Sequence, residues 1–138
     1  MAGDFVIDNS VVMAWCFEDE ANSYADTIQD MLIENKAFVP AIWPLEVTNV
    51  LLVAERKKRI SKAGSGHFTA LLSQLPIEVE PSDTDTIFHE TISLARQYML
   101  SSYDASYIEL AIRKGLPIAT QEKAIIRAAK KIQIEIIN

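Results

Sequence analysis

Residues 5–10 read FVIDNS, an apolar run that stops abruptly on an acid. Phe5, Val6 and Ile7 are continuously hydrophobic without a helical stripe, which is typical of a short strand buried on both faces. Strands of this kind belong to parallel sheets, where functional groups collect beyond the carboxyl ends. We therefore expect Asp8 either to face a functional site or to act as a turn or cap residue before a helix that begins near Ser10.

The rest of the chain alternates between short apolar runs and amphipathic segments. Further strands are predicted over 36–40, 77–80, 116–120 and 132–137. Helical spacing occupies the stretches between them, at 10–17, 20–35, 42–60, 67–75, 82–100, 101–115 and 121–131. This alternation predicts an α/β fold with a central, mostly parallel sheet of about five short strands flanked by helices.

Individual residues predict where some of the helices begin and end. Pro44 suits the first turn of its helix, and Gly115 suits a C-terminal cap. Ser82, followed three residues later by Asp85, resembles a capping box. The two glycines of 61–66 predict a loop before the next helix.

The overall composition describes a globular chain of 138 residues, 49% hydrophobic, with a net charge of −6. Residues 1–138 fit the size of one domain. The negative charge argues against general electrostatic binding to nucleic acid, although bound metal ions can neutralise an acidic site. A single cysteine, no apolar run of membrane-span length and no basic leader predict a cytoplasmic protein without a membrane segment.

Four acids occupy the ends of predicted elements. Asp8 ends the first strand, Glu46 and Asp104 lie near the starts of two helices, and Glu122 opens the last helix. Each has a simpler interpretation: Asp104 as an N-cap, Glu122 as a favourable charge at a helix N-terminus, Asp8 as a cap. Glu46 is harder to explain in this way because its neighbours Leu45 and Val47 are apolar.

Four segments together resemble the PIN-domain ribonucleases of the VapC toxin type. They are FVIDNSVVMAW (5–15), PLEVTNVLL (44–52), SSYDASYIELA (101–111) and GLPIATQEKAIIRAA (115–129), in the family's order and approximate spacing. The resemblance covers nearly the whole chain, so it implies one PIN domain over 1–138.

The resemblance implies a metal-dependent nuclease site. Asp8, Glu46 and Asp104 match the three principal acids of the family, and Glu122 stands where the family usually has an aspartate. Matching polar positions flank these acids: Ser10, Asn49 and Thr120. The carboxylate oxygens suit Mg²⁺, with Mn²⁺ as a substitute, and no Cys/His cluster offers a zinc site. Such an ion would activate a water and polarise the scissile phosphate of RNA.

Two further features bear on partners. Basic residues cluster in 55–62, where a favourable, solvated charge at a helix C-terminus is the preferred interpretation over phosphate contact. A second cluster lies on the helix after Glu122, where both interpretations stay open. The helix after Pro44 is apolar nearly all round, which indicates deep burial or an interface. The family resemblance implies a homodimer and a cognate antitoxin that covers the active-site groove.

Two other functions compete with this interpretation. A PIN-like fold could serve only as a binding or dimerisation module, because Glu122 departs from the family pattern and the net charge is negative. A phosphatase with Asp8 as nucleophile is disfavoured, because the expected second aspartate is Ser10 here. The RNA target is not encoded in any local motif.

Overall fold

A computed structural model describes residues 3–138 and contains a four-stranded parallel sheet in the order β3-β2-β1-β4. The strands are β1 (Phe5–Ile7), β2 (Ala37–Val39), β3 (Ile77–Val79) and β4 (Ile118–Ala119). The predicted α/β fold is confirmed. The segment predicted as a last strand contributes only a single bridge from Ile136 to Ile118, so the sheet has four strands rather than about five.

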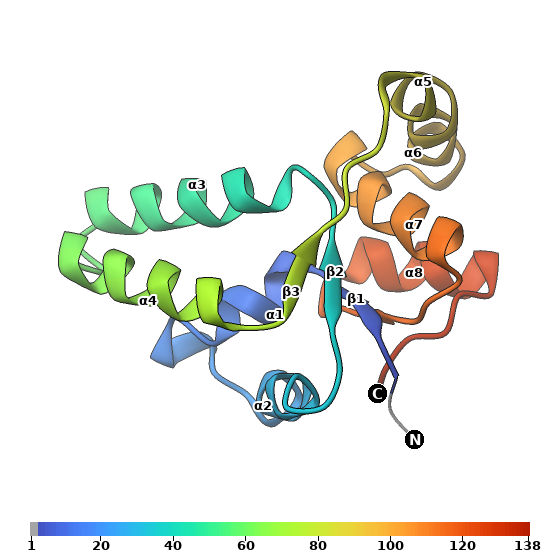
Figure 1. Cartoon of the computed structure of the whole chain (residues 1–138). Coiled ribbons are helices and arrows are strands. Elements are labelled where there is room, and N and C mark those ends of the chain that lie inside the picture. Colours follow the sequence, from blue (N-terminus) through green and yellow to red (C-terminus); the bar gives the residue numbers. More distant parts are fainter. Residues whose placement is uncertain (1–2) are drawn as a thin grey trace.

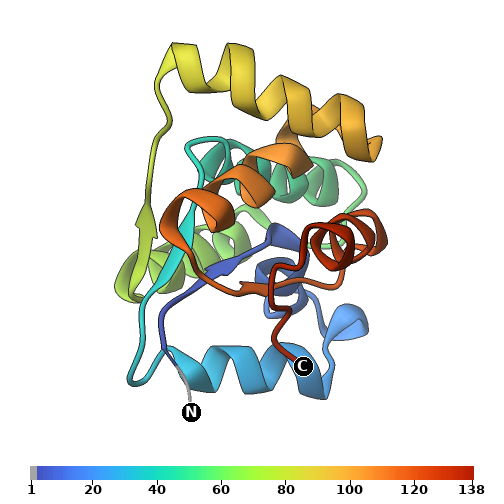
Figure 2. The ribbon, with the colours of Figure 1, turned by 90° about the vertical axis from the view of Figure 1, so that its right-hand side faces the viewer.

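Helices cover both faces of this sheet (Figure 1). The chain order gives, besides the strands, α1 (Asn9–Ala14), the 3₁₀ turn η1 (Glu18–Glu20), α2 (Ser23–Met31), α3 (Trp43–Arg56), α4 (Lys62–Gln74), α5 (Thr84–Thr86), the π-helical turn η2 (Ile87–Thr91), α6 (Ile92–Tyr98), α7 (Ser102–Lys114) and α8 (Lys123–Ile132). In Figures 1 and 2 the arm from α5 to α6 lies beside α7, at the opposite end of the molecule from α2.

The alternation of strand side chains divides the core into two clusters. Phe5 and Ile7 point toward α1 to α4, whereas Val6 joins Phe38 and Ile118 under α7 and α8. All three residues of β1 are fully buried. The continuous apolar run at the start of the chain is therefore a strand covered on both faces, as its sequence predicts.

Helix ends follow the sequence signals in some places and differ in others. Pro44 lies in the first turn of α3, and Gly115 ends α7 with φ +65°, both as predicted. The predicted loop at 61–66 is wrong: Ser61 caps α4, whose first turns contain Gly64 and Gly66. A Cβ on Gly64 would lie 2.8 Å from Cγ1 of Ile60, which explains a glycine inside this helix.

The helical arm also begins differently from the prediction. Asp83, not Ser82, is the N-cap of α5, and its carboxylate accepts a 2.7 Å hydrogen bond from the Thr86 amide. The Ser82 hydroxyl instead donates to the buried Glu109 carboxylate at 2.9 Å. Arg113 also pairs with Glu109, at 2.9 Å. Ser82 is thus engaged by the Glu109 carboxylate of α7, so the next residue, Asp83, caps the helix instead.

Candidate metal and nuclease site

The site lies where β1 and β4 end side by side. The two strands are parallel neighbours, and the Asp8 amide donates to the Ala119 carbonyl at 2.9 Å. Asp8 is the first residue after β1, and Thr120 is the first after β4. Because parallel strands end at the same edge of a sheet, these two side chains meet there, and both are buried.

Asp8 is held by hydroxyl groups on one of its carboxylate oxygens. Oδ2 accepts hydrogen bonds from Ser10 Oγ at 2.5 Å and from Thr120 Oγ1 at 3.1 Å, and a longer one from the Ser10 amide. Burial raises the pKa of the Asp8 carboxyl, and the hydrogen bonds from Ser10 and Thr120 oppose that rise. Asp8 is also the N-cap of α1, so both of its predicted roles are compatible with one geometry.

The same two hydroxyls tie the turn between β4 and α8 to Asp8. Ser10 Oγ accepts from the Gln121 amide at 3.1 Å, and Thr120 Oγ1 accepts from the Glu122 amide at 3.0 Å. Each hydroxyl therefore donates to the carboxylate and accepts from the backbone. This arrangement fixes the direction of both protons and orients Asp8 rigidly.

Glu46 approaches from α3 and is half-buried. Its Oε1 accepts a 2.6 Å hydrogen bond from the hydroxyl of Tyr107, a fully buried residue of α7. Burial and, to a smaller extent, the negative charge of Asp8 raise the pKa of Glu46, while the Tyr107 bond lowers it. The sequence does not single out Tyr107 as a site residue, because there it looks like one more core position of the helix.

Asp104 lies in the first turn of α7 but does not cap it. The cap is Ser101, whose Oγ accepts from the Asp104 amide at 3.0 Å, so the N-cap interpretation of Asp104 is wrong. Burial first, and then the charges of three other acids, raise the pKa of Asp104 to about 6; those acids are Glu122, Asp8 and Glu46. The four predicted acids therefore act on one another electrostatically, although they come from four different elements.

Glu122 occupies the N-cap position of α8, yet its side chain makes no capping hydrogen bond. Its carboxylate is the largest charge contribution to the raised pKa of Asp104. Asn49, one turn after Glu46 on α3, is exposed, and its side chain forms no hydrogen bond with any residue from 3 to 138. Glu122 and Asn49 thus lack the local partners that would give them a purely structural role.

The donor set suits a hard divalent cation. All four acids offer oxygen ligands and gather without a basic residue among the groups that shift the pKa of Asp104. Within the described residues, no group of three or more His, Cys, Asp or Glu side chains could by itself hold a metal ion. Mg²⁺ is commonly held by one or two carboxylates and keeps several waters, so the oxygen donors present match that ion by their chemistry. His67 lies on α4 and His89 on η2, and neither is among the groups that shift the pKa of Asp8, Glu46 or Asp104.

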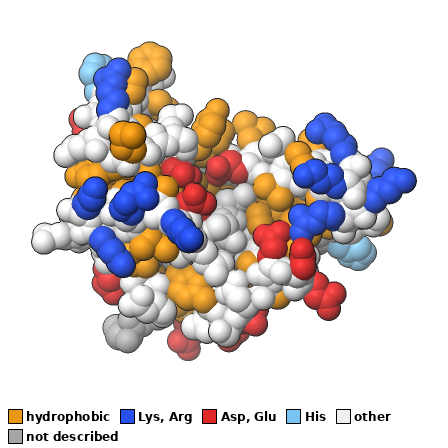
Figure 3. Space-filling view, turned by 180° about the vertical axis from the view of Figure 1, so that it is seen from behind, with side chains coloured by type: hydrophobic (Ala, Val, Ile, Leu, Met, Phe, Trp, Pro, Cys, Tyr) orange, Lys and Arg blue, Asp and Glu red, His pale blue; other side chains and the backbone are white. Residues whose placement is uncertain are grey.

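Basic side chains border the acidic centre. Figure 3 shows acidic side chains gathered in the middle of one face, with Lys and Arg on the α8 side and on the side of α3 and α4. On the α8 side the exposed basic residues are Lys123, Arg127, Lys130 and Lys131. The face therefore combines a carboxylate centre with cationic flanks, a distribution that suits a polyanion lying across bound cations.

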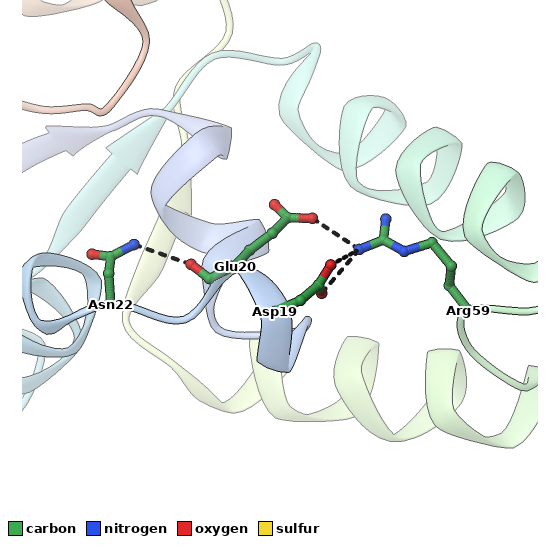
Figure 4. A network of polar contacts seen from close by, with 4 residues as sticks. All are labelled: Asp19, Glu20, Asn22 and Arg59. Atoms are coloured by element: carbon green, nitrogen blue, oxygen red, sulfur yellow. Dashed lines mark hydrogen bonds and ion pairs between the residues drawn. The ribbon is translucent and has the colours of Figure 1, made fainter.

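One residue of the other basic cluster has a structural role. Arg59 Nη2 pairs with Asp19 at 3.1 Å and with Glu20 at 3.2 Å (Figure 4). Its guanidinium also lies over the Phe17 ring. The Asn22 amide donates to the Glu20 carbonyl in the same network. Arg59 is therefore not simply solvated: its ion pairs connect η1 to the segment that follows α3.

The fold and the arrangement of acids define the class of protein to which the chain belongs. The PIN domain model matches residues 5–131, so the chain is a member of the PIN domain family. No curated protein sequence matches it significantly.

Solved structures with the same fold include proteins of toxin–antitoxin systems. PAE2754 from Pyrobaculum aerophilum has a TM-score of 0.70 and 23% identity over 93% of this chain and 87% of that one. VapBC2 from Rickettsia felis, bound to a promoter DNA fragment, has a TM-score of 0.67 and 14% identity, covering 98% and 97%. A toxin–antitoxin complex from Klebsiella pneumoniae has a TM-score of 0.61 and 14% identity, covering 86% of each chain. At these identities the similarity establishes the fold.

Proposed function

We propose that this PIN-domain chain is a Mg²⁺-dependent endoribonuclease, the toxin of a VapBC-like toxin–antitoxin pair. One observation carries the proposal: Glu122, Asp8 and Glu46, from three other elements, lie near enough to Asp104 that their charges add to the larger effect of burial and raise its pKa to about 6. A protein gains no stability from such repulsion, so the cluster points to a function that needs the charges. The family match over 5–131 supports treating residues 1–138 as one PIN domain.

The four carboxylates would hold the ion: Asp8, Glu46, Asp104 and Glu122. Bound there, Mg²⁺ supplies Lewis-acid polarisation of the scissile phosphate and a more acidic water. Ser10 and Thr120 fix Asp8 by donating to its Oδ2. Asn49 is free to contact the substrate, because its exposed side chain is committed to no partner among residues 3–138.

The choice of RNA as substrate rests on the family and on the charges around the site. Exposed basic residues of α8, beginning with Lys123 next to Glu122, lie where a phosphate backbone could run past the acids. Such contacts position a strand without reading its sequence, so the flank supports binding of RNA but not the choice of a particular target.

The proposed partners are a cognate antitoxin and a second copy of the chain. Two of the similar structures are VapBC2 and a toxin–antitoxin complex. On α3, the side chains of Leu45, Leu52 and Val53 remain exposed, which supports an interface along this helix. In the described part of the chain no helix is long and apolar enough to cross a bilayer. Cytoplasmic localisation is proposed from the family and the single cysteine.

The decisive experiment measures cleavage of a mixed RNA substrate with Mg²⁺ and with EDTA. We expect Mg²⁺-dependent cleavage that is lost in Asp8→Asn and in Asp104→Asn. Asp30→Asn is the matched control, because Asp30 is exposed on α2 and its side chain has no hydrogen bond within residues 3–138. If folded Asp8→Asn and Asp104→Asn both cleaved RNA as fast as the unaltered protein, the proposal would be wrong.

A catalytically inactive binding or dimerisation module is the second candidate. It is favoured by the absence, among the residues described, of any ready-made group of three metal-holding side chains. Calorimetry with Mn²⁺ separates the two candidates. Binding that disappears in Asp104→Asn supports the nuclease, whereas no binding by the unaltered protein supports the module.

A further inference from the structure

Tyr107 is the group that fixes the orientation of Glu46. Its hydroxyl donates a 2.6 Å hydrogen bond to Glu46 Oε1, joining α7 to α3 across 61 positions of sequence. We propose that Tyr107 is a positioning residue, which holds the Glu46 carboxylate for the cation of the proposed nuclease site. The inference rests on the proposed function for the cation, while the hydrogen bond itself can be tested separately.

The tyrosine ring is anchored far more firmly than the glutamate. Tyr107 has no exposed surface and packs in the cluster formed by Val6, Phe38 and Ile118 under α7 and α8. Glu46 has a flexible side chain and is only half-buried. The rigid partner therefore sets the direction of the flexible one, as second-layer groups commonly do around metal ligands.

The hydroxyl can act only as a donor in this setting. Its oxygen lies 2.6 Å from a carboxylate oxygen, which can only accept, so the tyrosine hydroxyl is the donor of this bond. The Glu46 bond is its sole hydrogen bond among residues 3–138, and an unpaired buried hydroxyl is costly. Tyr107 therefore holds Glu46 Oε1 in place by its hydrogen bond. The other oxygen, Oε2, accepts no hydrogen bond from the described residues and is available to a cation.

The position of Tyr107 on its helix adds a consequence. Tyr107 follows Asp104 by three residues, so both side chains project from neighbouring positions on one face of α7. One helix thus supplies an acid of the site and also the donor that orients a second acid from α3. The position of Glu46 relative to Asp104 therefore depends on the Tyr107–Glu46 hydrogen bond.

The first test compares Tyr107→Phe with Tyr103→Phe by calorimetric titration of metal-free protein with Mn²⁺. Tyr103 is the matched control, because it lies on α7 but is exposed, and its side chain has no hydrogen bond within residues 3–138. We expect roughly 10- to 100-fold weaker Mn²⁺ binding in Tyr107→Phe. Tyr103→Phe should bind as the unaltered protein does.

Equal Mn²⁺ affinity in Tyr107→Phe and the unaltered protein would overturn the inference while leaving the nuclease proposal standing. Failure of the unaltered protein to bind Mn²⁺ would overturn the metal site of the proposed function, and with it any role of Tyr107 toward a cation. The two failures are therefore distinguishable in one titration series.

The second test is a double-mutant cycle of urea unfolding that needs neither metal nor activity. Tyr107→Phe should lower the unfolding midpoint when Glu46 is present, because a buried hydrogen bond is removed. In the Glu46→Ala background the same change should leave the midpoint unchanged or raise it, because it removes an unpaired hydroxyl. An equal loss in both backgrounds, or failure to fold in both, would assign Tyr107 a packing role only and overturn the inference.

Discussion

The Thr120 hydroxyl donates a 3.1 Å hydrogen bond to Asp8 Oδ2, joining residues 112 positions apart in the chain. Both residues directly follow strands that lie side by side in the sheet. The bond therefore exists because β1 and β4 are parallel neighbours, and it connects the sheet register directly to the geometry of the acidic site.

Replacing Thr120 by valine should test this connection. The change keeps the shape of the side chain but removes the donor to Asp8 and the acceptor of the Glu122 amide. We expect a loss of about 1–3 kcal/mol in the free energy of unfolding. The pKa of Asp8 should rise further, because the hydrogen bond from Thr120 lowers it in the unaltered protein.

Urea unfolding and NMR titration of the Asp8 carboxyl measure these two effects. Thr27→Val is the matched control, since among residues 3–138 its hydroxyl bonds only to the Ser23 carbonyl, within an exposed turn of α2. Equal stability losses in the two variants would contradict a special role for Thr120.

Much of this arrangement could be predicted from the sequence because local patterns encode it. The apolar run ending at Asp8 and the run ending at Thr120 both indicate buried parallel strands, and parallel strands bring their ends together. The segment at 132–137 has a similar composition but makes only one bridge to the edge strand β4, because α8 extends to Ile132 and Gln133 caps it, which leaves few residues to run along the sheet.

The interactions that the sequence does not reveal all depend on distant partners. Tyr107 looks like an ordinary core residue because its acceptor, Glu46, lies 61 positions away. Ser82 looks like a helix cap until the buried Glu109 provides a stronger acceptor. Local propensity describes what a residue can do alone, whereas these side chains respond to charges that only the fold brings near them.

Asp104 should make the metal-free protein less stable as pH rises. Its pKa is about 6 in the folded state against an ordinary 3.8, so the folded state binds the proton more tightly than the unfolded state does. Protonation therefore stabilises the fold below about pH 4, and this stabilisation is lost as pH rises through about 6. For a half-exposed carboxylate the effect should be on the order of 1 kcal/mol after allowance for solvent screening.

Urea unfolding in EDTA at several pH values between about 4 and 8 checks this expectation. Asp104→Asn should flatten the profile and be more stable than the unaltered protein near neutral pH, even though it abolishes the proposed activity. If Asp104→Asn were instead less stable than the unaltered protein near neutral pH, the Asp104 side chain would contribute stabilising interactions that outweigh its repulsion from the neighbouring acids.

Divalent metal should stabilise the fold by neutralising the same repulsion. Addition of Mn²⁺ or Mg²⁺ is expected to raise the melting temperature, because a ligand that binds only the folded state shifts unfolding by mass action. Removal with EDTA should reverse the shift. Thermal unfolding of Asp8→Asn should show a much smaller metal response, and a response as large as that of the unaltered protein would contradict binding at this site.

The basic flank of α8 should contribute to RNA affinity through counterion release. Lys123→Ala or Arg127→Ala should weaken binding to single-stranded RNA and reduce the slope of log affinity against log salt by about 0.7 for each phosphate that the variant no longer neutralises. Fluorescence anisotropy in EDTA measures binding without cleavage. Lys36→Ala is the control, because Lys36 lies at the amino ends of the strands, directly before β2, whereas the acids lie at the carboxyl ends. Lys36 pairs there with Glu78 at 3.7 Å. An unchanged salt slope in both α8 variants would exclude these residues from the RNA path.

Glu122 should act through its charge rather than as a helix cap. Its side chain makes no capping bond, yet it is the largest charge contribution to the raised pKa of Asp104. Glu122→Gln should therefore lower the pKa of Asp104 and leave α8 intact, while weakening Mn²⁺ binding. Glu122→Asp, which introduces the aspartate usual in the family, should keep both the charge and the Mn²⁺ affinity. NMR titration of Asp104 and calorimetry of the two variants distinguish these effects. An unchanged pKa of Asp104 in Glu122→Gln would mean that the two carboxylates do not interact electrostatically. Glu122 would then not belong to the site.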